Sequence, residues 1–107
     1  MRLSAAILVA LLPCAAQAMT DEEARRHARM LGDILGAEQH CDLTYDQAAI
    51  AAWIEATIPA DRLDFASTVD GLANLARFTL DGQSLSQRTA FCTSIRRAAA
   101  HLGFITP

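Results

Sequence analysis

The chain has 107 residues, which is the usual size of one globular domain. Hydrophobic residues make up 52% of it and charged residues 20%, with only five Gly and three Pro, so the composition excludes a disordered, collagen-like or low-complexity chain. Nine basic and twelve acidic residues give a formal net charge of −3. That excess is too small to predict a nucleic-acid-binding surface or a polyanionic tail.

The first eighteen residues have the three parts of a secretory signal peptide. Arg2 gives a positive start, residues 3–12 form an apolar run that Pro13 ends, and residues 16–18 form a small-x-small cleavage site. As a helix the apolar run would cover roughly 15 Å, about half of the hydrocarbon core, so it is too short to span a membrane. We therefore expect cleavage after Ala18, a periplasmic or secreted location, and no stable membrane insertion afterwards.

Two cysteines remain in the expected mature domain, residues 19–107. Cys41 and Cys92 are an even number in an exported chain, and an oxidising compartment favours a disulfide between them. In the chain-entropy model, closing a loop of this size stabilises the fold by on the order of 4 kcal/mol, comparable to the net stability of a small domain. A redox-active pair is the alternative, although no Cys-x-x-Cys motif occurs. Cys14, just after the apolar run, leaves a lipid anchor open as another use of the leader.

The first predicted helix begins after Thr20. Acidic residues at 21–23 complete a capping-box pattern and lie near the positive end of the helix dipole. Apolar residues then recur at helical spacing to about residues 38–41. Gly32 and Gly36 lie four residues apart on one face, which predicts the close approach of a neighbouring helix.

The second and third predicted helices are joined by a tight turn. Thr44 and Gln47 repeat the capping-box pattern ahead of an Ala-rich run, and Pro59 both ends that helix and opens the next. The third helix, over about residues 60–80, carries the longest apolar stripe, and residues 81–82 stop it.

The fourth predicted helix begins at Ser84, which forms a capping box with Gln87, and ends near Leu102. Gly103 then takes a left-handed backbone and Phe104 folds back on the helix, as in a Schellman ending. No segment alternates with a period of two, so no strand is expected. The sequence therefore predicts an all-α fold: a small four-helix bundle with loops of roughly two to five residues, mostly antiparallel neighbours, and one disulfide.

The densest cluster of reactive residue types is His40, Asp42 and Asp46. One hypothesis uses them as acid–base groups of a small enzyme, in a cleft at the end of a helix. The interpretation that we favour is a polar turn whose side chains satisfy free backbone groups. Glu23 and His27 share a helical face, but two ligands do not make a metal centre. We therefore expect no catalytic, cofactor-binding or metal-binding residue.

Arginines and aromatic residues give two further candidates. The arginine clusters are Arg25, Arg26 and Arg29 on the first predicted helix and Arg96 and Arg97 on the fourth. Either could bind an anion or a lipid headgroup, but nearby acids at helical spacing favour an ion-paired surface around the first. The aromatic residues could line a ligand pocket, although a shared core is the simpler interpretation. They are Trp53, Phe65, Phe78, Phe91 and Phe104.

No familiar catalytic or cofactor motif occurs in the sequence: neither a nucleophile elbow, a zincin helix, a phosphate-binding loop nor a haem-attachment pair. We therefore expect a non-enzymatic binding or interaction role, in a monomer or small homo-oligomer that binds a protein or a small apolar ligand and no nucleic acid. In layout, the Cys41 and Cys92 pair, the helices and the small size resemble the periplasmic acid-stress chaperones of the HdeA type. That resemblance implies a chain that loosens at low pH, as its carboxylates protonate, and exposes apolar surface.

Overall fold

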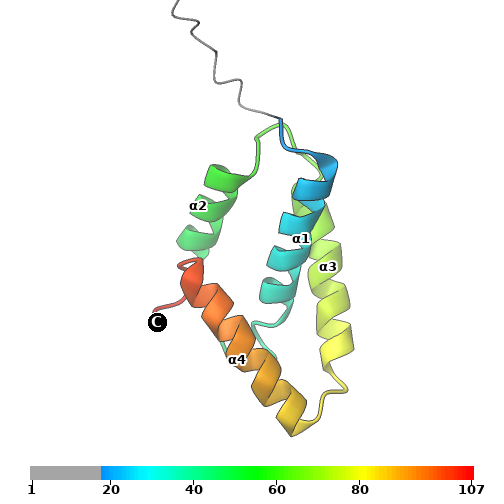
Figure 1. The fold of residues 1–107 in the computed structure, drawn as a ribbon, viewed down its shortest axis with the longest axis vertical. Coiled ribbons are helices and arrows are strands. Elements are labelled where there is room, and N and C mark those ends of the chain that lie inside the picture. Colours follow the sequence, from blue (N-terminus) through cyan, green and yellow to red (C-terminus); the bar gives the residue numbers. More distant parts are fainter. Residues whose placement is uncertain (1–17) are drawn as a thin grey trace, which may run out of the picture.

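The computed structural model describes residues 18–107, and over that range the chain has four helices and no strand (Figure 1). The helices in chain order are α1 Asp21–Gly36, α2 Gln47–Thr57, α3 Phe65–Leu80 and α4 Leu85–His101. This confirms the predicted all-α fold. The predicted signal peptide lies outside the described residues, apart from Ala18, an exposed residue just before α1.

Two helices begin where their capping residues predict. The Glu23 backbone N–H donates to Thr20 Oγ1 at 3.1 Å at the start of α1. At the start of α4, the Gln87 N–H donates to Ser84 Oγ at 3.2 Å and the Ser84 N–H donates to Gln87 Oε1 at 2.9 Å. These bonds satisfy backbone donors that have no partner within the helix.

The other two helices begin later than predicted. Asp46, and not Thr44, is the N-cap of α2, because the preceding backbone is already held by other partners: the Tyr45 N–H donates to the Glu38 carboxylate at 2.7 Å. The prediction of a tight turn at Pro59 is also wrong. Helix α2 ends at Thr57 and α3 begins only at Phe65, so residues 58–64 form a longer connection. Local hydrogen bonds within that connection order it without helix.

The connection after α1 is also longer than expected. Helix α1 ends at Gly36, but a turn continues to Asp42. Asp42 then takes a left-handed backbone with φ 54°, and the Leu43 N–H donates to the Glu38 carbonyl at 2.9 Å. This is the long hydrogen bond of a Schellman ending, here with Asp where Gly is usual. It sets the direction in which the chain leaves α1.

The end of α4 confirms the predicted Schellman motif. Gly103 has φ 81°, its N–H donates to the Ala100 carbonyl at 3.1 Å, and the Phe104 N–H donates to the Ala99 carbonyl at 2.9 Å. The motif turns Phe104 into the core, where its side chain is fully buried. One cluster of buried residues then joins all four helices; it includes Leu31, Ile50, Val69 and Ile95.

Helices α1 and α3 form the closest pair. Consecutive helices reverse direction, as predicted, but α1 and α3 run side by side in the same direction (Figure 1). The two glycines of α1 make this possible. A Cβ on Gly32 would lie 2.7 Å from Leu72 Cβ, and one on Gly36 would lie 2.6 Å from the Ala73 carbonyl oxygen. The predicted close approach of a neighbouring helix is therefore confirmed, and α3 is that neighbour.

Helix α2 is held at a greater distance. None of its Cα atoms lies within 8 Å of a Cα atom in α1, α3 or α4, and Ile50 is its only buried residue. Its attachment is through large side chains. The Trp53 ring packs edge-on against Phe104, with centroids 6.5 Å apart, and against His27, with centroids 5.7 Å apart.

Candidate functional site

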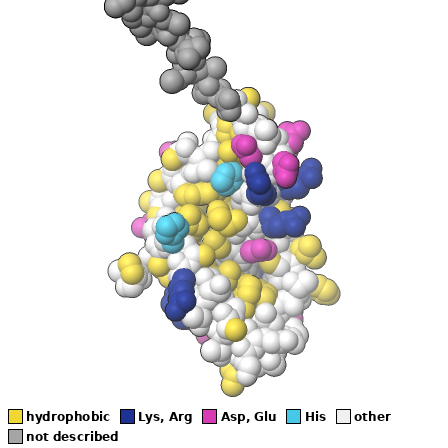
Figure 2. All heavy atoms as spheres, in the orientation of Figure 1, with side chains coloured by type: hydrophobic (Ala, Val, Ile, Leu, Met, Phe, Trp, Pro, Cys, Tyr) yellow, Lys and Arg dark blue, Asp and Glu magenta, His cyan; other side chains and the backbone are white. Residues whose placement is uncertain are grey.

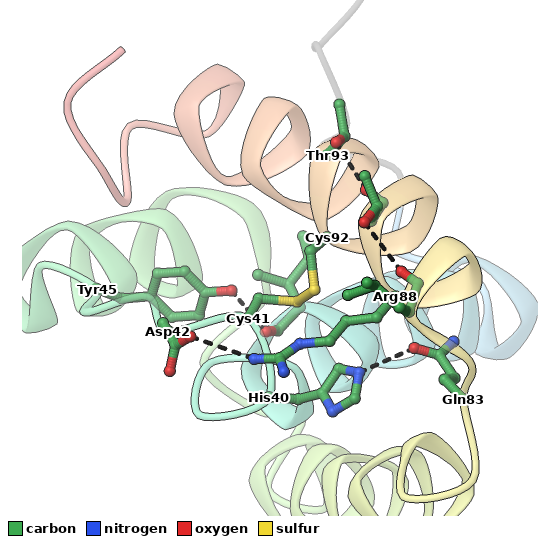
Figure 3. Close-up of a disulfide and its surroundings, with 11 residues drawn as sticks. His40, Cys41, Asp42, Tyr45, Gln83, Arg88, Cys92 and Thr93 are labelled. Atoms are coloured by element: carbon green, nitrogen blue, oxygen red, sulfur yellow. Dashed lines mark hydrogen bonds and ion pairs between the residues drawn. A yellow bond between two sulfur atoms is a disulfide. The ribbon is translucent and has the colours of Figure 1, made fainter.

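The predicted disulfide is present between Cys41 and Cys92, with the two Cα atoms 5.3 Å apart (Figure 3). Both cysteines are buried. Cys41 lies in the turn after α1 and Cys92 in the first half of α4, so the bond ties the end of one helix to the body of another. Its position within the core is that of a structural crosslink.

Two residues of the acid–base hypothesis, His40 and Asp42, lie near the disulfide but contact different partners (Figure 3). The His40 ring hydrogen-bonds through Nε2 to Gln83 Oε1 at 2.8 Å. Arg88 donates to Asp42 Oδ2 at 3.2 Å, and Asp46 caps α2. The structure therefore does not assemble His40, Asp42 and Asp46 into one acid–base group. Asp46 does satisfy a backbone N–H, as the polar-turn interpretation predicts, whereas Asp42 pairs with a side chain.

The second candidate pair, Glu23 and His27, does not belong to a larger group of metal-ligating side chains among residues 18–107. His27 packs against the Trp53 ring, and Glu23 is exposed near the start of α1. In the part of the chain that the structure describes, no three His, Cys, Asp or Glu side chains lie close enough together to hold a metal ion.

The aromatic residues do not line one pocket. Phe65 and Phe104 are buried, Trp53 and Phe91 are partly buried, and Phe78 is 78% exposed. The prediction that all of them contribute to the core is therefore wrong for Phe78. The apolar stripe of α3 faces α1, and Phe78 lies on the other side of the helix, directed to solvent.

An apolar groove lies between α1, α3 and α4, and we call it the α3 groove. It has a volume of about 430 Å³. Its apolar lining consists of Leu72, Leu75, Ala76, Leu80 and Phe91, and its polar lining consists of Thr79, Arg29 and Asp33. Leu75 is 58% exposed at the groove, and it lies next to the other apolar residues of the lining instead of standing alone on the surface.

The α3 groove is not among the sites predicted from the sequence. Leu75 lies off the apolar stripe of the third predicted helix, which is formed by Phe65, Val69, Leu72, Ala76 and Leu80. A large apolar residue outside the main stripe of an amphipathic helix is the signal that could have found it. Phe78, three residues further on, also lies outside the stripe, but it does not line the groove.

Burial and neighbouring charges shift the pKa values of two ionisable side chains, Asp33 and Tyr45. Partial burial raises the pKa of the Asp33 carboxyl at the α3 groove above its usual value, and the nearby Arg29 guanidinium offsets part of that rise. Burial raises the pKa of Tyr45 to about 12, and the Glu38 carboxylate adds to the effect. The Tyr45 hydroxyl donates to the Ile34 carbonyl at 2.8 Å, which fixes the connection after α1 to that helix.

On the face of the molecule shown in Figure 2, charged side chains gather over the N-terminal part of α1, and hydrophobic side chains are exposed between α1 and α2. None of the helices in residues 18–107 combines the length and the hydropathy needed to cross a bilayer. Comparison with protein-family models, with curated proteins and with solved structures finds no significant match to this chain. The function must therefore be argued from the geometry alone.

Proposed function

We propose that this protein is an exported, non-enzymatic binding module that takes an amphipathic helical segment of a partner protein into the α3 groove. The observation that carries the proposal is the apolar lining of that groove together with the exposure of Leu75 within it. Contiguous exposed apolar surface rimmed by polar residues is typical of a protein or ligand interaction site.

The shape and the charges of the groove favour a helix as the occupant. An amphipathic helix presents large apolar side chains at intervals of three and four residues, which suits a groove that runs along one helix. The volume of about 430 Å³ falls within the usual size of a binding cleft. Arg29 and Asp33 lie at the α1 side of the groove and give one positive and one negative group to orient the partner.

The acid-stress chaperone alternative rests on the resemblance in layout. Acid unfolding requires carboxylates whose pKa is lowered in the folded state, because their protonation then favours the unfolded chain. Asp33 does not contribute to such a response, because its pKa is raised and its protonation relieves a penalty on the folded state. The alternative predicts that the protein suppresses the aggregation of client proteins at about pH 3, below the usual carboxylate pKa range.

Photo-crosslinking in the periplasm of a bacterial host tests the proposal. A photoreactive residue at position 75 should capture a discrete partner protein, and the same residue at Asp70, exposed elsewhere on α3, should not. Thr79→Trp should abolish the capture by filling the α3 groove, because Thr79 lines the groove and is itself exposed. Unchanged circular dichroism of this variant would show that the fold is intact.

Two results would contradict the proposal. Equal capture from positions 75 and 70, or no capture from position 75, would show that the groove is not a protein-binding surface. Native mass spectrometry distinguishes the small-ligand alternative: a reproducible extra mass on the purified protein that Thr79→Trp removes would show that the groove holds a small apolar molecule.

A further inference from the structure

A second hollow lies over the disulfide, on another side of α4, with a volume of about 340 Å³. The turn after α1 contributes Cys41 and Asp42 to its lining, and α4 contributes Arg88, Cys92 and Arg96. The hollow shares no lining residue with the α3 groove and is independent of the function proposed for that groove.

The α4 side of this hollow is basic because two arginines of α4 line it. Arg88, Cys92 and Arg96 are four residues apart in turn, so their side chains follow one face of the helix. The two arginines are separated by roughly 12 Å along the helix axis, which their long side chains can bridge across Cys92. Arg97, next to Arg96 in the sequence, does not line the hollow. The structure therefore groups Arg96 with Arg88, whereas the sequence suggested Arg96 with Arg97.

A carboxylate of the protein itself already lies against one of these arginines. Asp42 Oδ2 and Arg88 Nη2 are 3.2 Å apart, and the Asp42 side chain is 87% exposed (Figure 3). An exposed ion pair of this kind is weak, so another anion can replace its carboxylate. Within residues 18–107 the two side-chain ion pairs are Arg62 with Asp21 and Arg88 with Asp42, and Arg96 belongs to neither.

The backbone of Asp42 gives an independent observation. Its φ of 54° is in the left-handed region, which Gly adopts without strain and which Asp tolerates less well. Gly would therefore close the turn after α1 at least as well. Asp at this position places a carboxylate at the edge of the hollow, opposite Arg88, and a strained residue that points at a site is a reason to look for function there.

We propose that Arg88 and Arg96 bind an oxyanion, a carboxylate or a phosphate group, over the disulfide, and that Asp42 occupies Arg88 until the oxyanion displaces it. Guanidinium groups suit such ligands because two parallel N–H donors match two oxygens. The nearby Thr89 and Thr93 hydroxyls donate to helix carbonyls, at 2.9 and 2.7 Å. The arginines are therefore the donors that remain for the ligand.

Titration of the oxidised protein with inorganic phosphate, and separately with succinate, at constant ionic strength tests the site. The NMR signals of the arginine Nε–Hε groups report on each guanidinium. We expect saturable shifts at Arg88 and Arg96 and none at Arg97, which is the matched control on the same helix. Arg96→Gln should weaken binding by tenfold or more, and Arg97→Gln should leave it unchanged.

The role of Asp42 has its own test. Asp42→Asn should tighten the binding of phosphate several-fold, because it removes the competing carboxylate from Arg88. Asp70→Asn makes the same change of charge at an exposed position of α3 and should have no effect. Equal affinities for Asp42→Asn and the unaltered protein would overturn the displacement step.

The ligand group can belong to a free anion or to a lipid headgroup, and flotation with vesicles distinguishes the two. Binding to vesicles that contain phosphatidylglycerol, but not to vesicles of phosphatidylcholine alone, with loss in Arg96→Gln and not in Arg97→Gln, would assign the site to a lipid. The proposal is overturned if phosphate and succinate shift Arg88 and Arg96 no more than Arg97 and if the two variants bind vesicles equally.

Discussion

The α1–α3 pair and helix α2 are packed in opposite ways. Helices α1 and α3 meet along glycines, and a Cβ at Gly36 would lie 2.9 Å from Ala76 Cβ. Helix α2 has no Cα within 8 Å of another helix and is attached through Trp53 and Ile50. In the α1–α3 pair the two backbones are in close contact, whereas α2 is attached to the rest of the domain by a few large side chains.

The difference shows that hydrophobic composition does not set how closely a helix packs. Helix α2 has a higher mean hydropathy than α1. Its inner face nevertheless carries bulky residues, which keep the neighbouring backbones apart. Its small residues lie on the outer face instead, and these are Ala48, Ala51, Ala52 and Ala56. In α1 the small residues face the partner helix. The side of the helix on which small residues fall therefore decides the distance.

The largest effect is expected from Phe104→Ala, which removes the fully buried ring that Trp53 packs against. The free energy of unfolding should fall by about 3–5 kcal/mol, as for other buried Phe side chains. Phe78→Ala is the matched control and should change stability by no more than about 0.5 kcal/mol, because Phe78 is exposed. Denaturant unfolding measures both.

Hydrogen exchange sharpens the same comparison. In Phe104→Ala the amides of α2 should lose protection before those of α1 and α3, because α2 depends on few side-chain contacts. Equal loss of protection in all three helices would show that the two regions unfold as one unit.

A smaller effect is expected from Gly36→Ala. The added methyl group would lie 2.6 Å from the Ala73 carbonyl oxygen, so α1 and α3 must separate, at a loss of about 1–3 kcal/mol in denaturant unfolding. Gly71→Ala is the control, since nothing lies within 4 Å of a Cβ there. It should raise stability by about 0.5–1 kcal/mol through helix propensity. Similar behaviour of the two variants would contradict the tight α1–α3 contact.

The smallest effect is expected from Asp33→Asn. Because the pKa of Asp33 is raised in the folded state, its charge disfavours folding at neutral pH, and this penalty disappears as the pH falls below the ordinary value of 3.8. The variant should therefore unfold at a slightly higher temperature at pH 7, within about 0.5 kcal/mol, and match the unaltered protein at pH 3. A less stable variant at pH 7 would mean that attraction to Arg29 outweighs the effect of burial.

The features that could be predicted from the sequence are mostly local. The capping box of Ser84 with Gln87 and the turn at Gly103 depend on residues within a few positions of each other, so the pattern contains all the information. The disulfide could be predicted because only two cysteines remained after the expected leader. The start of α2 could not, because Tyr45 is held by Glu38, a partner from an earlier turn.

The candidate sites were less predictable than the fold. The sequence places His40, Asp42 and Asp46 together because they are close along the chain, yet each bonds to a different partner: His40 to Gln83, Asp42 to Arg88 and Asp46 to the start of α2. The α3 groove and the hollow over the disulfide combine residues from separate helices, and their spacing depends on how the helices cross. Neighbours in sequence, such as Arg96 and Arg97, can belong to different surfaces.

The sequence by itself determined that the chain is helical, where two helices begin, how the last one ends, and which cysteines pair. Tertiary structure alone decided that α1 and α3 run parallel in contact, that α2 stands apart, and that Leu75 and Phe78 remain exposed. The physical reason is the difference in the distance along the chain over which these interactions act. Caps and periodicity act over one helical turn, whereas packing depends on which side-chain shapes meet across the core.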